Sequence, residues 1–335
     1  ASMRLQPPDS ARTASVTLVG TMFALTIYRD LSARCVFLKV ARSCALPGML
    51  FCVLAVLQPA LPAAPQLPSR NVTDYGVRGD GEATETALIQ GAIDACAVDG
   101  GCTLHFPAGR YVTGTLYFRD NITLNLAPGA VLATSGRVED YTAPALLYGK
   151  GVNGIALTGG GEIQAGPVPA PDETTVHNPG SKLLSLVLIE NATNVQIRGI
   201  RFLRSPVWTI TLRVVDAAWL DNLLIENATL APNTNGVVID SSTHVSVHAL
   251  NFRGGGAGIT LQTSLVDGIA PPCAGITVTG STLRSGSMAF RVGTPTNGDI
   301  RNVVVSDSVI EASQGGIGVF APVSYTHLRA HETGR

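Results

Sequence analysis

The sequence predicts an all-β protein, a right-handed parallel β-helix with an N-terminal capping helix. Three observations predict this fold: the composition, a recurring pattern of apolar residues, and one helical segment ahead of that pattern. Hydrophobic residues make up 45% of the 335 residues, charged residues 14% and aromatic residues 5%, and glycine occurs 36 times. Such a chain fits many short strands around small aliphatic side chains, and it is unlike a disordered protein or a coiled coil.

The charge balance excludes one class of partner. Lys and Arg number 23 against 24 Asp and Glu, which gives a formal net charge of −1. Because there is no basic excess to neutralise phosphates, we expect no nucleic-acid partner. His327 and His331 are four residues apart, a spacing that on a helix would suit a metal pair, but no third ligand accompanies them, so we expect no metal. We also expect no cofactor and a monomeric protein.

The N-terminal region resembles a leader followed by a secretion signal. Residues 43–64 contain the apolar run 45–57 (ALPGMLFCVLAVL), which follows Lys39 and Arg42 and precedes proline and small residues. This order is typical of a signal peptide, and the short, proline-flanked run disfavours the alternative of a transmembrane anchor. We therefore expect a secreted protein, periplasmic or extracellular, with no membrane attachment after signal removal. Residues 1–42 are either translated upstream sequence or a small β-domain.

The C-terminal residues 322–335 break every pattern before them. Their sequence, PVSYTHLRAHETGR, resembles translated sequencing-adapter DNA, so we expect an artefactual tail. The β-helix domain is then expected to span 65–321 and to be truncated at its C-terminal end.

From about residue 118 onward the pattern apolar-x-apolar-x-x-small/apolar-x-apolar recurs. Its clear copies begin at Val195, Ala218, Val245, Ile276 and Val303, and weaker copies begin near Ile122 and Ile155. Each copy has two short stretches of alternating residues with a corner between them, and the spacing between copies varies. This pattern predicts the stacked coils of a solenoid, whose inward aliphatic side chains are buried only by neighbouring coils.

The first coil of a solenoid needs a cap, and residues 84–98 (TETALIQGAIDACAV) supply one. Apolar residues recur there at helical spacing, and Thr84 is placed to cap the helix. The apolar residues are Leu88, Ile89, Ala92, Ile93 and Cys96. Cys96 and Cys102 lie on either side of a Gly-Gly turn, and the spacing fits either a disulfide or a buried free thiol at Cys96.

Several segments resemble a known family. NVTDYGVRGDG at 71–81, followed by TALIQGAIDAC, GGCTLHFPAGRYVTGTLYF and NITLNLAPGAVL, resembles the start of pectin-lyase-type β-helix proteins. SPVWTI at 205–210, NTNGVVIDS at 233–241 and GGGAGITLQT at 254–263 resemble the central motifs of glycoside hydrolase family 28, which contains the polygalacturonases. The resemblance covers about 71–321 and implies a glycosidase that acts on pectic or related polysaccharide.

The same motifs depart from the family pattern at its catalytic positions. The family's Asn-Thr-Asp-Gly reads Asn-Thr-Asn-Gly here, so Asn235 stands at the aspartate. The paired aspartates read Gly256 and Ala257, and the histidine of Gly-His-Gly falls on Met288. The Arg-x-Lys motif is expected beyond the last residue. The catalytic residues are therefore unassigned, and the resemblance alone favours an O-glycosyl hydrolase.

Glycoside hydrolysis needs two carboxyl groups roughly 5–9.5 Å apart. Four strands predicted between 236 and 321 are expected to stack in register, with their outward residues on one face. Asp240 is the one carboxylate on that face, and its stacked neighbour is Gln262. Asp240 either takes part in chemistry or orders the turn at Ser241–Ser242.

Carboxylates on predicted loops offer a substitute for the missing pair. They are Asp172, Glu173, Glu226 and Asp267, and for each the favoured interpretation is a solvated loop charge.

Two further residues on the expected substrate face are binding candidates. Arg291 is predicted to point outward, where it would pair with the carboxylate of a uronic acid or form a salt bridge with Asp240. Trp208, in SPVWTI, would stack on a sugar ring or fill the core.

Three functions follow from these observations. The first is a polygalacturonase-like hydrolase, favoured by the family resemblance. The second is a non-catalytic carbohydrate-binding β-helix, favoured by an intact scaffold without the catalytic carboxylates. The third is a polysaccharide lyase, in which Arg291 would abstract a proton beside a uronate, although no acidic Ca²⁺ cluster accompanies it.

Overall fold

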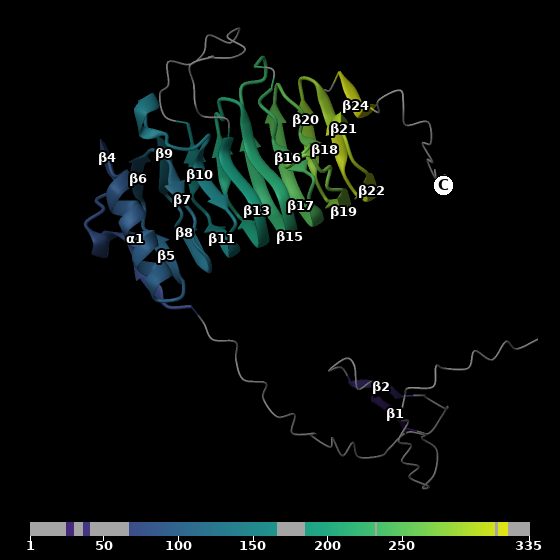
Figure 1. Cartoon of the computed structure of the whole chain (residues 1–335), viewed down its shortest axis with the longest axis horizontal. Helices are drawn as coiled ribbons and strands as arrows, with labels where there is room; N and C mark the ends of the chain where they lie inside the picture. The colour runs from purple at the N-terminus through teal and green to yellow at the C-terminus, as the bar shows by residue number, and fades with distance from the viewer. Residues whose placement is uncertain are drawn as a thin grey trace, which may run out of the picture. The chain divides into compact units, whose positions relative to one another are not determined.

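A computed structural model describes most of the chain after residue 66 (Figure 1). The described ranges are 67–165, 185–231, 233–311 and 314–320, together with the backbone of β1 (Leu25–Arg29) and β2 (Val36–Val40). The chain divides into two compact units, 1–63 and 64–335. In the first unit β1 and β2 pair antiparallel. The predicted signal peptide, residues 166–184 and the predicted tail lie outside the described residues.

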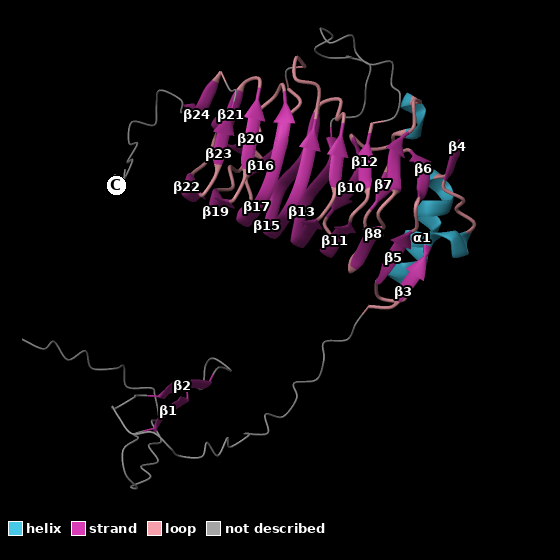
Figure 2. Cartoon of the chain, turned by 180° about the vertical axis from the view of Figure 1, so that it is seen from behind, coloured by secondary structure: helices cyan, strands magenta, loops and turns pink. Residues whose placement is uncertain are grey.

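The second unit is a solenoid of parallel strands that form three long ladders, which we call sheets I, II and III (Figure 2). All pairings between successive coils of the solenoid are parallel. Sheet I consists of β7 (Leu116–Tyr117), β10 (Ala145–Lys150), the first parts of β13 (Ser185–Arg198) and β15 (Trp208–Glu226), β16 (Val237–Asp240), β18 (Ile259–Thr263), β21 (Met288–Thr296) and β24 (Gly315–Phe320).

Sheet II adjoins sheet I around a corner that β13 and β15 cross without interruption. It consists of β3 (Ser69–Asn71), β5 (Cys102–Phe106), β8 (Ile122–Leu126), β11 (Asn153–Gly159), the following parts of β13 and β15, the first part of β17 (Thr243–Gly254), β19 (Cys273–Thr279) and β22 (Ile300–Ser306).

Sheet III completes each coil. It consists of β4 (Asp80–Thr84), β6 (Gly109–Thr113), β9 (Ala130–Thr134), β12 (Glu162–Gln164), β14 (Arg201–Leu203), the ends of β15 and β17, β20 (Thr282–Ser285) and β23 (Val309–Glu311). A short 3-10 helix, η2 (Val138–Asp140), lies in the connection between β9 and β10.

The register of sheet II confirms the predicted repeat. Val195, Ala218, Val245, Ile276 and Val303 are successive partners along the ladder. The first four of these side chains are buried in one continuous aliphatic core, and Val303 packs against it. Successive residues of each strand therefore point alternately into the core and outward along the solenoid.

The N-terminal end of the solenoid carries the predicted helix, α1 (Thr86–Val98), beside η1 (Val72–Tyr75) (Figure 2). The helix begins at Thr86 rather than at Thr84, which ends β4, so the expected cap at Thr84 is wrong. Glu85 occupies the capping position, but its carboxylate accepts the N–H groups of Arg78 at 2.6 Å and Gly79 at 3.1 Å. The Glu85 carboxylate therefore stabilises the turn at Arg78 and Gly79 instead of capping α1.

The buried face of α1 is narrower than its sequence suggests. Ile89, Ala92, Ile93 and Cys96 are buried as predicted, whereas Leu88 is 46% exposed. Leu88 lies at the margin of the apolar stripe, where the side chain faces away from the first coil.

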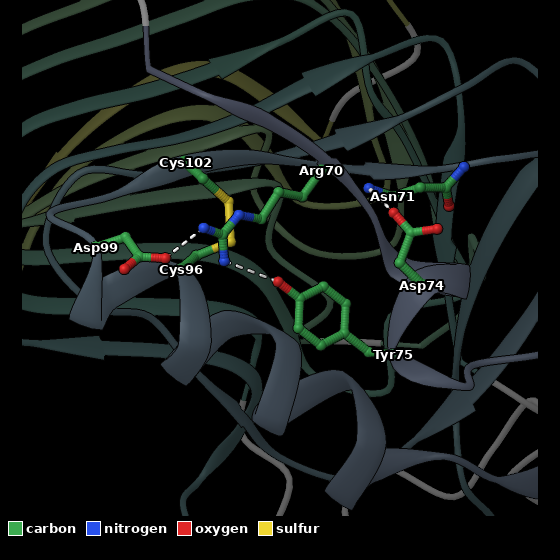
Figure 3. The surroundings of a disulfide bond; sticks show 7 residues. All are labelled: Arg70, Asn71, Asp74, Tyr75, Cys96, Asp99 and Cys102. Atoms are coloured by element: carbon green, nitrogen blue, oxygen red, sulfur yellow. Dashed lines mark hydrogen bonds and ion pairs between the residues drawn. A yellow bond between two sulfur atoms is a disulfide. The ribbon is translucent and has the colours of Figure 1, made fainter.

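A disulfide joins the end of α1 to the first strand of the core (Figure 3). It links Cys96 to Cys102, which resolves the two alternatives left by their spacing. Beside it the Arg70 guanidinium contacts Asp99 and donates to the hydroxyl of Tyr75 at 2.9 Å (Figure 3). These contacts fasten the cap to β3 and β5.

The corner between sheets I and II requires left-handed backbone. Asn191, Val214 and Ser241 follow stacked residues of sheet I on successive coils, and all three have a φ near +50°. Asn adopts this region readily, whereas a β-branched residue such as Val does so at a cost. Val214 is therefore a strained member of this corner.

Candidate functional site

The outward face of sheet I carries the predicted site residues. Val238, Thr260, Arg291 and Gly318 are successive partners in the ladder, as the sequence predicts, and Asp240 pairs with Gln262. Their chain neighbours Val237, Ile239, Ile259 and Leu261 belong to the core. The side chains of the first group therefore point away from the core.

One expected partner on this face is absent from the ladder. The register shifts between Leu261 and Thr263, so that Thr263 pairs with Thr296 and Gln262 has no partner at Gly293. Pro295 supplies a physical reason, because proline has no N–H to donate to a ladder.

The outward face is also less open than the sequence suggests. Val238 and Asp240 are fully buried, Thr260 is 2% exposed and Gln262 is 6% exposed. Asp240 and Gln262 were expected to meet a substrate, but their polar atoms are occupied by protein partners. The accessible part of the face lies at Arg291, which is partly exposed.

Asp240 is the centre of a buried hydrogen-bond network. Its Oδ2 accepts the Ser264 hydroxyl at 2.7 Å and the Gln262 amide at 3.1 Å, and it pairs with Nε of Arg213 at 3.3 Å. Its Oδ1 accepts the Ser264 N–H at 2.8 Å and the Ser241 hydroxyl at 3.1 Å. The Ser242 hydroxyl donates to the Asp240 backbone carbonyl at 2.9 Å. Both carboxylate oxygens therefore serve the turn after β16 and the next coil.

The network continues toward the N-terminal end of sheet I. Arg213 Nη1 donates to Glu190 Oε1 at 3.0 Å, and the Tyr148 hydroxyl donates to Glu190 Oε2 at 2.7 Å. Burial and the bond to Glu190 raise the pKa of Tyr148 to about 12. Lys150, Glu190, Arg213 and Asp240 are successive ladder partners, so the row follows the solenoid axis.

Sequence reasoning did not find Arg213 and Glu190 as part of this row. The repeat carries the signal for this row, because Glu190 lies one coil before Arg213, and Arg213 lies one coil before Asp240. Loops of unequal length between coils hide this spacing when the sequence is read without the register.

Arg291 and Thr260 hold the unpaired polar atoms of the face. Arg291 Nε and Thr260 Oγ1 are buried and form no hydrogen bond, and the two residues are direct ladder partners. The guanidinium carbon of Arg291 lies 5.3 Å from the ring centre of Phe320. The ion pair expected between Arg291 and Asp240 is not formed, since Asp240 pairs with Arg213 instead. Arg291 Nε and Thr260 Oγ1 therefore lie on neighbouring strands of sheet I without hydrogen-bond partners.

The positions of the family's aspartates are closed by local contacts. Asn235 Oδ1 accepts the backbone N–H of Ala257 at 2.9 Å, and Thr234 Oγ1 accepts that of Gly256 at 3.2 Å. A Cβ on Gly256 would lie 2.6 Å from both Asn235 Oδ1 and the carbonyl carbon of Thr234. Met288, at the position of the family's histidine, pairs with Gly315 on the next coil. Asn235, Gly256, Ala257 and Met288 therefore supply no titratable side chain.

Trp208 begins β15, is partly exposed and pairs with Ser185. Its backbone carbonyl accepts the Ser205 hydroxyl at 2.8 Å. It lies outside the buried core cluster, which leaves its ring available at the edge of sheet I.

Among the loop carboxylates, Asp172 and Glu173 lie outside the described residues. Asp267 and Glu226 are exposed. Within the described ranges, no three His, Cys, Asp or Glu side chains are grouped to hold a metal ion. No helix in the same ranges is long and apolar enough to cross a membrane.

Residues 69–318 match the family described as "Rhamnogalacturonase A/epimerase, pectate lyase-like". The chain belongs to this family. Its fold is the right-handed parallel β-helix that the sequence predicts.

Two relatives show how far the similarity extends. The chain is 44% identical over 78 residues to an exo-poly-alpha-D-galacturonosidase of Dickeya chrysanthemi, covering 23% of this chain and 13% of the relative. It is 26% identical over 294 residues to a probable polygalacturonase of Vitis vinifera, covering 75% of this chain and 56% of the relative. The chain therefore matches less than two thirds of the length of either relative.

Solved structures share the fold. An exopolygalacturonase from Thermotoga maritima is 21% identical, with a TM-score of 0.66 over 76% of this chain and 69% of that one. The family 28 exopolygalacturonase of Yersinia enterocolitica is also 21% identical, with a TM-score of 0.67 over 76% of this chain and 56% of that one. At this identity the likeness establishes the architecture alone.

Proposed function

We propose that this chain binds an acidic, pectic-type polysaccharide on the outward face of sheet I and does not hydrolyse it. The observation that carries the proposal is the contact between Asn235 Oδ1 and the Ala257 N–H, at the positions where the family has carboxylates. An amide cannot shuttle a proton, and loss of one positioned acid or base typically lowers a rate by about 10²–10⁴-fold.

The carboxylates that remain on this face are not free for acid–base chemistry. Glu190 and Asp240 both pair with Arg213, at 3.0 Å and 3.3 Å. Asp240 also has no exposed surface, so neither a glycosidic oxygen nor a water on a sugar can reach it. A hydrolase needs one carboxyl group to protonate the leaving oxygen and a second to activate water or attack carbon.

Binding is supported by Arg291, whose side chain is partly exposed on this face and pairs with no carboxylate among the described residues. A uronate carboxylate would supply an acceptor to the guanidinium nitrogens other than the buried Nε. The relatives named above are described as enzymes of polygalacturonate, which supports a uronic acid polymer as the ligand. A secreted protein would encounter such a polymer outside the cell, and the predicted signal peptide agrees with this proposal.

The test uses the full chain and de-esterified polygalacturonate. We expect saturable binding by calorimetry and no release of reducing ends. Arg291→Ala should weaken binding about tenfold or more, which corresponds to about 1.4 kcal/mol. Arg284→Ala is the matched control, because Arg284 is an exposed arginine of sheet III that pairs with Glu311.

Each contrary result points to a different function. New reducing ends would establish the hydrolase that the family resemblance favours. A product with ultraviolet absorbance would establish a lyase. Equal affinity of the parent and Arg291→Ala would remove Arg291 from the binding site.

A further inference from the structure

A tryptophan on the outward face of sheet II has no role in the site described above. Trp219, one of two tryptophans, lies in the middle of β15 and is 54% exposed. Its ladder partners on the two neighbouring coils are the polar residues Gln196 and Ser246. Tryptophan is usually well buried, so a half-exposed ring at the centre of a regular sheet calls for an explanation.

A row of polar and ionisable side chains runs beside this ring. Arg198, Asp221 and His248 are successive ladder partners, and Asp221 lies two residues after Trp219 on the same face of β15. Two residues along a strand span about 6.6 Å, which is close to the length of one sugar ring with its hydroxyls. The strands β13, β15 and β17 that carry the row lie side by side in the stack (Figure 1).

These side chains keep hydrogen-bonding capacity. His248 Nδ1 bonds Asp221 Oδ1 at 2.8 Å, while Arg198 reaches Asp221 Oδ2 only at 3.3 and 3.4 Å. Among the described residues, Nε2 of His248 and Nη1 of Arg198 form no hydrogen bond. The bond to His248, and then Arg198, holds the pKa of Asp221 below its usual range, so the carboxylate remains an acceptor.

A surface hollow adjoins the row. Its volume is about 300 Å³, and it is lined by Thr158, Gly159, Arg198, Gly199, Asp221 and Asn222. Gly199 has a φ of +71°, and a Cβ there would collide with the Gly159 carbonyl. The backbone of this corner therefore leaves no room for a side chain that would fill the hollow.

We propose that Trp219, with Arg198, Asp221, His248 and the adjoining hollow, forms a second glycan-binding site that takes a pyranose ring of a polysaccharide. The ring of Trp219 would stack on the apolar face of the sugar, and the row beside it would exchange hydrogen bonds with its hydroxyls. A sugar offers hydrogen-bond donors and acceptors, and the row of Arg198, Asp221 and His248 contains both kinds of group. A nucleic acid fits poorly, because Asp221 would face its phosphates.

A protein partner fits this surface less well than a sugar. The exposed apolar group near Trp219 in the ladder is Val304, and Thr277 and Ser246 separate the two. A stable protein interface needs an apolar core much larger than one ring.

The site is tested on the full chain with two probes, de-esterified polygalacturonate and a neutral galactan. Trp208→Phe leaves Trp219 as the sole tryptophan, so its fluorescence reports on this surface alone. We expect a saturable fluorescence change with at least one probe, and protection of Trp219 from iodide quenching. Trp219→Ala should weaken the retardation of the chain in gels containing that probe by about tenfold, or about 1.4 kcal/mol.

Val98→Ala is the matched control, since Val98 is an exposed apolar residue at the end of α1, and it should leave retardation unchanged. Arg291→Ala should keep the fluorescence response of Trp219, which separates this site from the face of sheet I. Circular dichroism confirms that each variant is folded. An unchanged Trp219 signal with both probes, or equal retardation of Trp219→Ala and the parent, would overturn the proposal.

Discussion

The side-chain oxygen Oδ1 of Asn235 accepts the backbone N–H of Ala257 at 2.9 Å, across two adjacent coils of the solenoid. This bond ties the residue two positions before β16 to the residue two positions before β18. It places a structural contact where the motif resemblance leads us to expect acids, and Gly256 beside it leaves no space for a side chain. We therefore expect Asn235→Asp and Gly256→Asp to differ in their effect on the free energy of unfolding.

Asn235→Asp should fold normally, because a carboxylate oxygen can accept the same N–H. Gly256→Asp should be destabilised by about 1–3 kcal/mol, because its Cβ meets backbone and side-chain atoms of the preceding coil. Urea unfolding of both variants measures the difference. Equal stability of the two would show that the loop at 254–257 can move aside.

Loss of the Asp240 carboxylate should be costly. Asp240→Ala leaves the N–H and hydroxyl of Ser264 without their acceptor and removes a partner of Arg213, so we expect a loss of about 3 kcal/mol in the free energy of unfolding. Chemical denaturation measures it. Asp299→Ala, at an exposed aspartate, is the control and should change stability by less than about 0.5 kcal/mol. A loss as small as that of the control would mean that the network is dispensable.

Tyr148 should give the protein a distinct alkaline transition. Its pKa is raised from 10.0 to about 12 by burial and by its bond to Glu190. The folded state therefore favours the protonated phenol, so its contribution to stability is complete below pH 10 and disappears as the pH rises toward 12. The difference between the tyrosinate absorbance titrations of the parent and Tyr148→Phe isolates this group. A difference curve centred near pH 10 would contradict the assignment.

Val214→Asn should stabilise the corner between sheets I and II. Its stacked neighbours Asn191 and Ser241 have the same left-handed backbone, which costs a β-branched residue roughly 1–2 kcal/mol. We expect a gain of about 1 kcal/mol and a rise in Tm of about 2–4 °C, measured by thermal unfolding. Val309→Asn, at an exposed strand position outside this corner, should bring no gain. A lower Tm for Val214→Asn would show that the valine side chain contributes more by packing than it loses by strain.

Much of the fold could be predicted from the sequence because a solenoid repeats its core positions. The copies that begin at Val195, Ala218 and Val245 lie one above another, and the family motifs fall on β15, β16 and β18. Trp219, which the sequence analysis did not single out, points outward between the core residues Ala218 and Leu220. Its exposure was not predicted, because it depends on which side chains flank it on neighbouring coils.

The sequence by itself determined the β-helix and its capping helix, because these depend on local periodicity and on residue identity. The tertiary structure alone decided that Asp240 pairs with Arg213, that Cys96 bonds to Cys102, and that Arg291 keeps a buried donor without an acceptor. The physical reason is that such partners belong to different coils or to the two sides of a turn. Loops of unequal length set which side chains meet across a spacing of about 4.8 Å, and only the folded register reveals them.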